Sequence, residues 1–328
     1  MQTLPFYIII TPRSLKYLKF AVWSLQVRKD MTVILVANGL DQTESTDLTL
    51  FAEQIGCDLI NLPTKKVMSH GASLDYLLAQ HSAPWFCFCD SDIISHDDDA
   101  CDIYPASELK AISSCDAMFW DDSEVKGVLG RCNKWPDGSP NMASFFCVYE
   151  TSTLKRVRAK YDIGFDNITY NQIHSTDLRQ LLLGKGINEQ SRKLDTGKAL
   201  TAAMELEQVP FEHKNIASLL HVGGLSSWML NGDRKLVHSA YHLTDEDLYQ
   251  IAGADSWLFN LNSQREPEHA IFYLRRQQRL AAARYCFQLI SHHVDHTPMP
   301  THDLSDQDFI AKIGLISDAI GRYYQEFP

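Results

Sequence analysis

Blocks of hydrophobic and polar residues alternate along about the first ninety positions, and short polar connections separate them. Compact apolar runs cover residues 6–10, 32–37 and 57–62, and their length is typical of buried strands. Between these runs, apolar residues recur at helical spacing over residues 14–27, 45–55 and 70–80. Strands that alternate with helices through short loops predict a parallel sheet with crossover helices, so we expect an α/β fold.

The next apolar run, residues 84–89, is followed directly by Asp90-Ser91-Asp92. A continuous run of aromatic residues and cysteine predicts a strand that is buried on both faces and ends where the chain returns to water. In an open parallel sheet, ligands bind in the crevice beyond the carboxyl ends of the strands. We therefore expect the two carboxylates to hold a metal-bound phosphate there.

The pattern loosens after residue 100. Residues 117–120 and 143–149 are predicted strands, and the Gly-, Pro- and Asn-rich stretch 127–141 between them is a predicted loop. Residues 176–183 and 197–206 are predicted helices, and 209–213 a short strand. Near the C-terminus, residues 268–290 carry a long helical pattern.

Composition narrows the class of protein. The chain has 328 residues, of which 45% are hydrophobic and 22% charged, as in ordinary globular proteins. A formal net charge of −11 argues against nonspecific binding to nucleic acid, which needs a positive surface. The 8 cysteines show no paired metal-binding spacing, no apolar run is long enough to span a bilayer, and the first residues do not resemble a signal peptide. We expect a cytoplasmic protein without a transmembrane segment.

These features together resemble the GT-A glycosyltransferases, and within them the family-2-like enzymes, which move a sugar from a nucleotide donor with inversion. The resemblance covers roughly residues 5–230. The motifs that carry it are Thr11-Pro12-Arg13 after the first strand, Asn38-Gly39 after the second, Gly71-Ala72-Ser73-Leu74-Asp75 in the third helix, and Asp90-Ser91-Asp92.

The resemblance implies a fold, a domain organisation and an activity. The fold would be a Rossmann-like, mostly parallel sheet flanked by helices, with a helical C-terminal extension. A glycosyltransferase domain would cover residues 1–240, with a nucleotide-binding half at 1–100 and an acceptor half at 101–240, and the extension would cover 241–328. The activity would be hexosyl transfer (EC 2.4) from a UDP-, GDP- or dTDP-sugar to a glycan, a lipid-linked acceptor or a small molecule.

The resemblance also suggests a metal site and a general base. Asp92, Asp90 and His221 would hold Mn²⁺ or Mg²⁺, a ligand set of oxygens and one imidazole that suits these ions. Asp195, in Leu194-Asp195-Thr196-Gly197, would be the general base, and Asp177 is the competing candidate. Each assignment has a structural alternative: Asp195 as the N-cap of the helix that follows, and His221 as a buried core histidine.

The same resemblance suggests which residues contact the substrates. The candidate donor-binding residues are Thr11, Arg13, Asn38, Asp58, Lys65, Gly71, Asp90 and Ser91, and the candidate acceptor-binding residues are Trp120 and Asp121. Asp121 and its neighbour Asp122 also form a third possibility for the base. Among these residues, Asn38 resembles the position that contacts the uracil or ribose of the donor.

The sequence is compatible with two other functions. A nucleotidyltransferase on a related sheet would begin with a Gly-rich phosphate loop, whereas the first strand here ends in Thr11-Pro12-Arg13-Ser14. A noncatalytic protein that kept the fold as a binding or scaffolding module is the second alternative, because fold alone does not decide activity.

Overall fold

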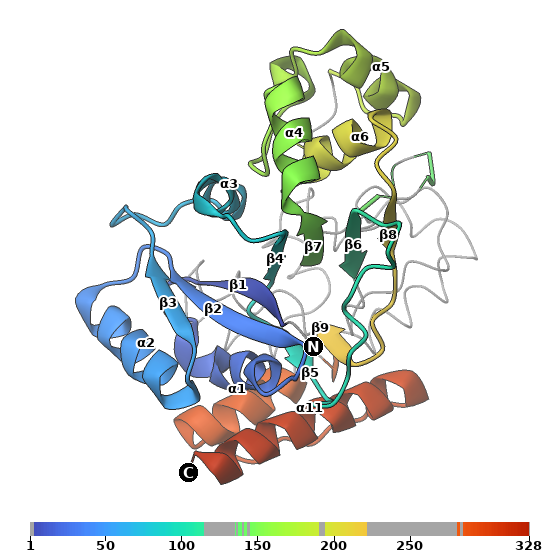
Figure 1. Ribbon diagram of the computed structural model, residues 1–328. Helices are drawn as coiled ribbons and strands as arrows, with labels where there is room; N and C mark the ends of the chain where they lie inside the picture. Colours follow the sequence, from blue (N-terminus) through green and yellow to red (C-terminus); the bar gives the residue numbers. More distant parts are fainter. Residues whose placement is uncertain are drawn as a thin grey trace.

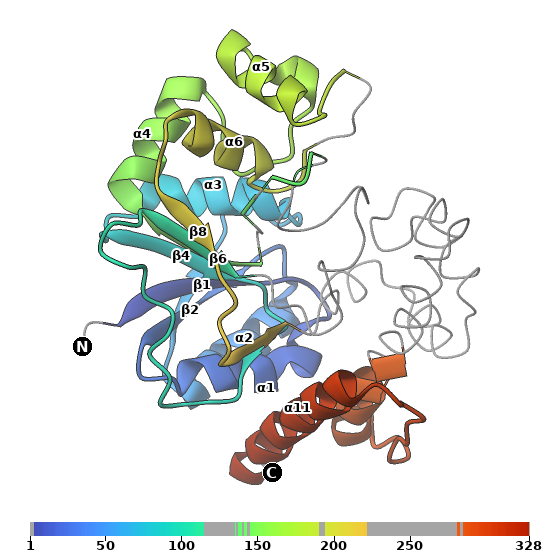
Figure 2. The ribbon, with the colours of Figure 1, turned by 90° about the vertical axis from the view of Figure 1, so that its right-hand side faces the viewer.

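Figures 1 and 2 show a computed structural model of the chain from two directions. The structure describes residues 3–114, 135, 137–139, 141–142, 145–189, 194–221, 281–282 and 285–327. The predicted strand at 117–120, most of the predicted loop at 127–141 and the proposed domain boundary at 240 lie outside these residues.

A mostly parallel sheet forms the centre of the described structure (Figure 1). Its strand order is β3-β2-β1-β4-β7-β6-β8. Neighbouring strands run parallel except at β7, which is antiparallel to both β4 and β6. The strands are β1 (Leu4–Ile10), β2 (Met31–Ala37), β3 (Asp58–Asn61), β4 (Trp85–Cys89), β6 (Ala111–Ser114), β7 (Phe146–Glu150) and β8 (Phe211–His213).

Helices cover both faces of this sheet. They are α1 (Leu15–Gln26), α2 (Gln42–Ile55), α3 (His70–Gln80), α4 (Thr151–Tyr161), α5 (Thr176–Gly184), α6 (Lys198–Leu206) and α11 (Gln307–Glu326), with a 3₁₀ turn η1 (Tyr170–Gln172). Alternate residues of the central strands feed two separate cores, as expected from the two-residue repeat of a strand. Phe6 and Cys87 join the core beneath α1, α2 and α11, whereas Tyr7 and Phe88 join the core beneath α3, α4 and α6. The predicted α/β fold class is confirmed.

A second, two-stranded sheet lies beside the first. It pairs β5 (Ile93–Ser95) with β9 (Leu219–His221) in antiparallel register. Neither β5 nor its pairing is evident from the sequence, because three residues are too few for a periodic signal and the partner strand is distant in the chain. This small sheet brings the segment after β4 against the segment that ends at His221.

The C-terminal helices pack on the N-terminal part of the sheet. The ring of Tyr17 in α1 stacks on Phe287 with centroids 5.8 Å apart, and Trp23 in the same helix contacts Tyr323 in α11 at 5.9 Å. Within the predicted helix at 268–290, the described residues 281–282 and 285–290 are helical, and the helix continues to residue 295. The C-terminal extension therefore shares one hydrophobic core with β1 and β2.

Some elements differ from the sequence prediction. The strand expected at 143–149 is β7, shifted to Phe146–Glu150, and neither β6 nor α4 was predicted. Helix α4 carries four basic residues and few apolar ones, so its sequence has no compact apolar run. In the described part of the chain, every helix is too short or too polar to cross a lipid bilayer.

Candidate metal and nucleotide site

Two carboxylates stand where β4 leaves the sheet, as the sequence predicted. The amide of Asp90 donates to Phe145 O at 2.7 Å, just before β7, and the amide of Ile93 donates back to Asp90 O at 3.3 Å. This turn directs the Asp92 side chain inward, where it is 1% exposed, whereas the Asp90 side chain is 24% exposed. The two carboxylates are therefore unequal: one is buried and the other is partly open to ligand.

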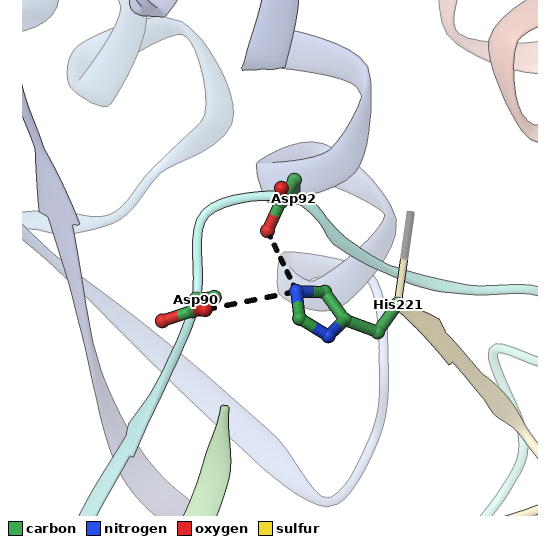
Figure 3. A group of neighbouring side chains, drawn as sticks. All are labelled: Asp90, Asp92 and His221. Carbon is green, nitrogen blue, oxygen red and sulfur yellow. Dashed lines mark hydrogen bonds and ion pairs between the residues drawn. The ribbon is translucent and has the colours of Figure 1, made fainter. Parts of the chain in front are cut away.

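His221 completes the cluster from the other strand of the small sheet. It is the last residue of β9 and pairs in register with Ile93, next to Asp92. Its Nε2 lies 3.1 Å from Asp92 Oδ1 and 3.6 Å from Asp90 Oδ2, so the imidazole points between the two carboxylates (Figure 3). His221 is buried, and its Nε2 faces both carboxylates.

A buried arginine fixes the small sheet in place. The Arg28 guanidinium bonds to Asp30 at 2.8 Å through both Nε and Nη2, and its Nη1 donates to Ser95 Oγ at 3.1 Å and Ser218 Oγ at 2.7 Å. Ser95 ends β5 and Ser218 precedes β9. Since both Arg28 and Asp30 have fully buried side chains, this network holds the two strands that carry Asp92 and His221.

The electrostatics of the cluster suit a cation. Burial raises the pKa of Asp90, and the neighbouring Asp92 and Asp195 carboxylates raise it further, while His221 opposes them. Burial lowers the pKa of His221, but Asp92 and Asp90 outweigh that effect and leave it raised. One ligand atom from each of Asp90, Asp92 and His221 can be chosen so that all lie within 4.8 Å of one another. Two carboxylate oxygens and one imidazole nitrogen form a donor set that fits Mn²⁺ or Mg²⁺.

His70 is a neighbour of the cluster that the sequence analysis missed. It is the first residue of α3, and its Nε2 lies 3.9 Å from Asp90 Oδ1. Its ring meets the Phe88 ring edge-on, with centroids 6.1 Å apart. In the sequence, His70 stands out only as the residue before Gly71 at the start of a predicted helix. The fold is needed to show that this helix start faces Asp90.

Asp195 lies close enough to act on this group of side chains. Its charge raises the pKa of Asp90 and also opposes the effect of burial on the pKa of His70. The carboxylate is exposed and accepts a hydrogen bond from the Thr196 amide at 2.8 Å. The N-cap of α6 is Gly197, with φ 75°, so the alternative role of Asp195 as the helix cap is wrong.

Asp177, the competing base, stands elsewhere. It is an exposed residue in the first turn of α5, whose cap is Ser175. Helix α5 lies at the opposite end of the described structure from β5 and β9 in both views (Figures 1 and 2). The structure therefore brings Asp195, and not Asp177, toward the carboxylate cluster.

Three predicted donor contacts stand at the carboxyl ends of β1 and β2. Asn38 is buried, and its side-chain amide bonds to the backbone of Met68 at 2.8 and 3.0 Å, which ties the loop before α3 to β2. Thr11 Oγ1 is buried and has no hydrogen-bond partner among the described residues. Arg13 adopts a left-handed φ of 68°, and its amide donates to Glu44 at 2.5 Å.

The remaining predicted contacts are dispersed. Asp58 begins β3, so it stands at the opposite end of that strand from the carboxyl edge, and Lys65 is exposed in the loop before α3. Ser91 is buried between the two aspartates, and Gly71 is buried in the first turn of α3. Trp120, Asp121 and Asp122 lie outside the described residues.

Comparison with known proteins gives only distant matches. No protein-family profile and no curated protein sequence matches the chain. Among solved structures, Staphylococcus aureus TarS 1–349 in complex with UDP is 12% identical, with 98% of this chain and 92% of that chain covered and a TM-score of 0.39. The mannosyltransferase PcManGT from Pyrobaculum calidifontis, in complex with GDP-Man and Mn²⁺, is 10% identical, with 100% of this chain and 91% of that chain covered and a TM-score of 0.40.

A third similar structure is the glycosyltransferase GlyE of Streptococcus pneumoniae TIGR4. It is 12% identical, with 64% of this chain and 45% of that chain covered, and the TM-score is 0.36. The chain thus spans less than half of the GlyE structure and most of the other two. Similarities of this size do not identify an activity, so the function must be inferred from the residues of the chain itself.

Proposed function

We propose that the protein is a divalent-metal-dependent glycosyltransferase that moves a sugar from a nucleoside-diphosphate donor to a hydroxyl acceptor, with inversion. One observation carries the proposal. Asp90, Asp92 and His221 gather where β4 leaves a mostly parallel sheet, with ligand atoms within 4.8 Å of one another. That edge of such a sheet is where phosphate-bearing ligands bind.

The roles of the three residues follow from their burial. Asp92 and His221, 1% and 4% exposed, are the inner ligands, and the more open Asp90 faces the donor. A bound Mn²⁺ or Mg²⁺ would stabilise the negative charge that develops on the diphosphate leaving group. Without a cation, two adjacent carboxylates, one of them buried, are only partly compensated by one imidazole, which supports the assignment of this cluster to metal binding.

Asp195 is the proposed general base. Inverting transfer needs one carboxylate that accepts the proton of the acceptor hydroxyl as the oxygen attacks the sugar. Asp195 is exposed, is free of the helix-capping role, and lies near enough to Asp90 to raise its pKa. Asp177 on α5 has none of these electrostatic links to the cluster among the described residues.

The donor contacts rest on position. Thr11 and Asn38 stand at the carboxyl ends of adjacent strands, and Thr11 Oγ1 lacks a partner among the described atoms. We assign Thr11, Asn38 and Ser91 to the nucleotide side of the site, with UDP, GDP or dTDP as the nucleotide. The acceptor is a hydroxyl group on a glycan, a lipid-linked acceptor or a small molecule.

Donor turnover tests this function directly. The protein is incubated with UDP-, GDP- and dTDP-sugars, with Mn²⁺ or with EDTA, and the released nucleoside diphosphate is measured. Slow Mn²⁺-dependent release of nucleoside diphosphate is expected even without an acceptor, because water can replace the hydroxyl. In a parallel incubation with a nucleoside triphosphate and a sugar 1-phosphate, release of pyrophosphate would instead identify a nucleotidyltransferase. Tight nucleotide binding without turnover of any donor would identify a noncatalytic binding protein.

A further inference from the structure

Residues 164–168 connect the two sides of the candidate site, and we refer to them as the linking segment. They follow α4 and precede η1, and their backbone bonds both to α3 and to the residues around Asp195. The segment is anchored by the buried ring of Phe165, which packs on Phe88 with centroids 5.4 Å apart. Phe88 is two residues before Asp90, so the anchor lies beside the strand that ends at the metal cluster.

On the α3 side, one carboxylate holds the linking segment. Asp75 accepts the Phe165 amide at 3.1 Å through each of its oxygens and the Asp166 amide at 3.2 Å. Arg158 Nε of α4 lies 3.2 Å from the same carboxylate. Since the Asp75 side chain is 18% exposed, these are well-shielded, charge-assisted bonds to backbone groups that no strand or helix satisfies.

The first turn of α3 fits closely against the same backbone. A Cβ at Gly71 would overlap the backbone of Phe165 and Asp166, so no side chain has room there. Ser69, which caps α3 through the Ala72 amide, also donates to Asp166 Oδ1 at 2.7 Å. The helix that starts at His70, beside Asp90, is therefore in direct contact with the linking segment.

On the other side, the linking segment brackets Asp195. Gly197 N donates to Phe165 O at 2.9 Å, and Leu194 and Ile168 exchange backbone bonds of 2.8 and 3.3 Å. Asp195 lies between these two attachments, one residue after Leu194 and two before Gly197. Asp195 itself accepts the Thr196 amide through Oδ1 and the Lys198 amide at 3.0 Å through its backbone oxygen, and the two flanking attachments hold this turn against the linking segment.

We propose that Asp75 is a positioning residue: by holding the linking segment against α3, it sets the place of Asp195 relative to Asp90. The proposal rests on the proposed function, since it takes Asp195 to be the base. It gives Asp75 and Gly71 a shared task that differs from contact with the donor. A misplacement of about 1 Å at a catalytic group can lower a rate by about a hundredfold.

Asp75→Asn tests the proposal, because it keeps the size of the side chain and removes its charge. We expect kcat to fall by about tenfold or more, while the Kd of the nucleotide with Mn²⁺ stays within about twofold. Hydrogen exchange provides a readout that does not depend on activity. The amides of Leu194 and Gly197 should exchange faster in the variant, whereas those of β4 should not.

Glu207→Gln is the matched control. Glu207 holds Arg156, Lys160 and Tyr161 at the outer end of α4, so its loss weakens the same helix without a bond to the linking segment. We expect it to lower Tm and to leave kcat unchanged. If Asp75→Asn leaves kcat and exchange at Leu194 and Gly197 unchanged, or if both variants lower kcat equally, the proposal is overturned.

Arg158→Gln is a milder variant if Asp75→Asn fails to fold. It removes the ion pair with Asp75 from a residue whose side chain is 38% exposed, and a smaller change in the same direction is expected in kcat and in exchange. A wild-type protein without donor turnover would contradict the proposed function. In that case unchanged exchange at Leu194 and Gly197 in Asp75→Asn or Arg158→Gln would overturn the positioning role separately, and faster exchange would support it.

Discussion

The metal cluster and the Asp195 region differ in how the chain builds them. Asp92 and His221 are almost completely buried, and they sit on a two-stranded sheet that Arg28 locks from within. Asp195 is exposed and is placed through backbone bonds to the linking segment. The contrast fits the proposed roles: the side chains that would hold a cation are built into the core, whereas the carboxylate that would meet an acceptor stays accessible on a supported loop.

The largest effect is expected at the metal cluster. Asp92→Asn should lower donor turnover by about a thousandfold or more, because the variant loses a ligand of the metal ion that stabilises the charge on the leaving group. The measurement is kcat at saturating Mn²⁺ together with the Kd of the nucleotide. Asp177→Asn, on the exposed surface of α5, is the matched carboxylate control and should match the wild-type protein.

Asp90→Asn distinguishes loss of the metal from loss of the fold. In the absence of metal, this variant should melt at the same temperature as the wild-type protein or higher, since it removes a carboxylate that repels the neighbouring Asp92. The same variant should show no stabilisation by Mn²⁺. A large drop in the metal-free Tm would mean that Asp90 serves the fold and not the ion.

Arg28→Gln probes the support of the cluster. The fully buried guanidinium of Arg28 bonds to Asp30, Ser95 and Ser218. Its removal leaves the buried carboxylate of Asp30 without its cation. We expect a loss of about 3 to 5 kcal/mol in the free energy of unfolding, measured by urea denaturation. Lys16→Gln, which removes a surface ion pair with Asp295, should cost less than about 1 kcal/mol.

Asp195→Asn tests the other region. Donor turnover with acceptor should fall by about a hundredfold or more, because the proton acceptor is removed, while nucleotide and Mn²⁺ affinities stay within about twofold. Both quantities come from steady-state kinetics and calorimetry. Equal turnover in Asp195→Asn and the wild-type protein would return the role of base to another carboxylate.

The smallest expected effect concerns the pH dependence of stability and involves His213 in β8. Burial lowers the pKa of His213 to about 4, and the charge of Lys198 acts in the same direction. The Nδ1 atom of His213 lies 2.9 Å from Ser113 Oγ. The unfolded chain therefore binds more protons below pH 6.5, so stability present above that pH is lost as the pH falls toward 4. We expect His213→Gln to remove about 1 to 3 kcal/mol of this acid dependence in urea unfolding. An identical pH dependence in both proteins would contradict this.

The sequence predicts one region better than the other for a physical reason. The apolar run before Asp90 is a local signal, and a strand buried on both faces must end where polar groups begin. Three crossover helices, α1, α2 and α3, and the strand β2 were also predicted to within a few residues, because hydrophobic periodicity is a property of neighbouring positions.

The missed features depend on distant pairings. His70 approaches Asp90 only because α3 packs beside β4, and the bonds from Asp75 to Phe165 join residues 90 positions apart. Asp58 differs from these residues. It was expected beside the donor, but the predicted strand 57–62 already places it near the start of the strand, and β3 begins at Asp58, opposite Ile34.

Direct titration with Mn²⁺, followed by electron paramagnetic resonance of the free ion, tests the central claim that Asp90, Asp92 and His221 hold a divalent cation. The wild-type protein and Asp177→Asn should each bind one Mn²⁺ per chain, more tightly in the presence of UDP or GDP, and Asp92→Asn and His221→Gln should lose that site. Binding of Mn²⁺ that is equal in the wild-type protein and in Asp92→Asn would contradict the metal site and, with it, the proposed function.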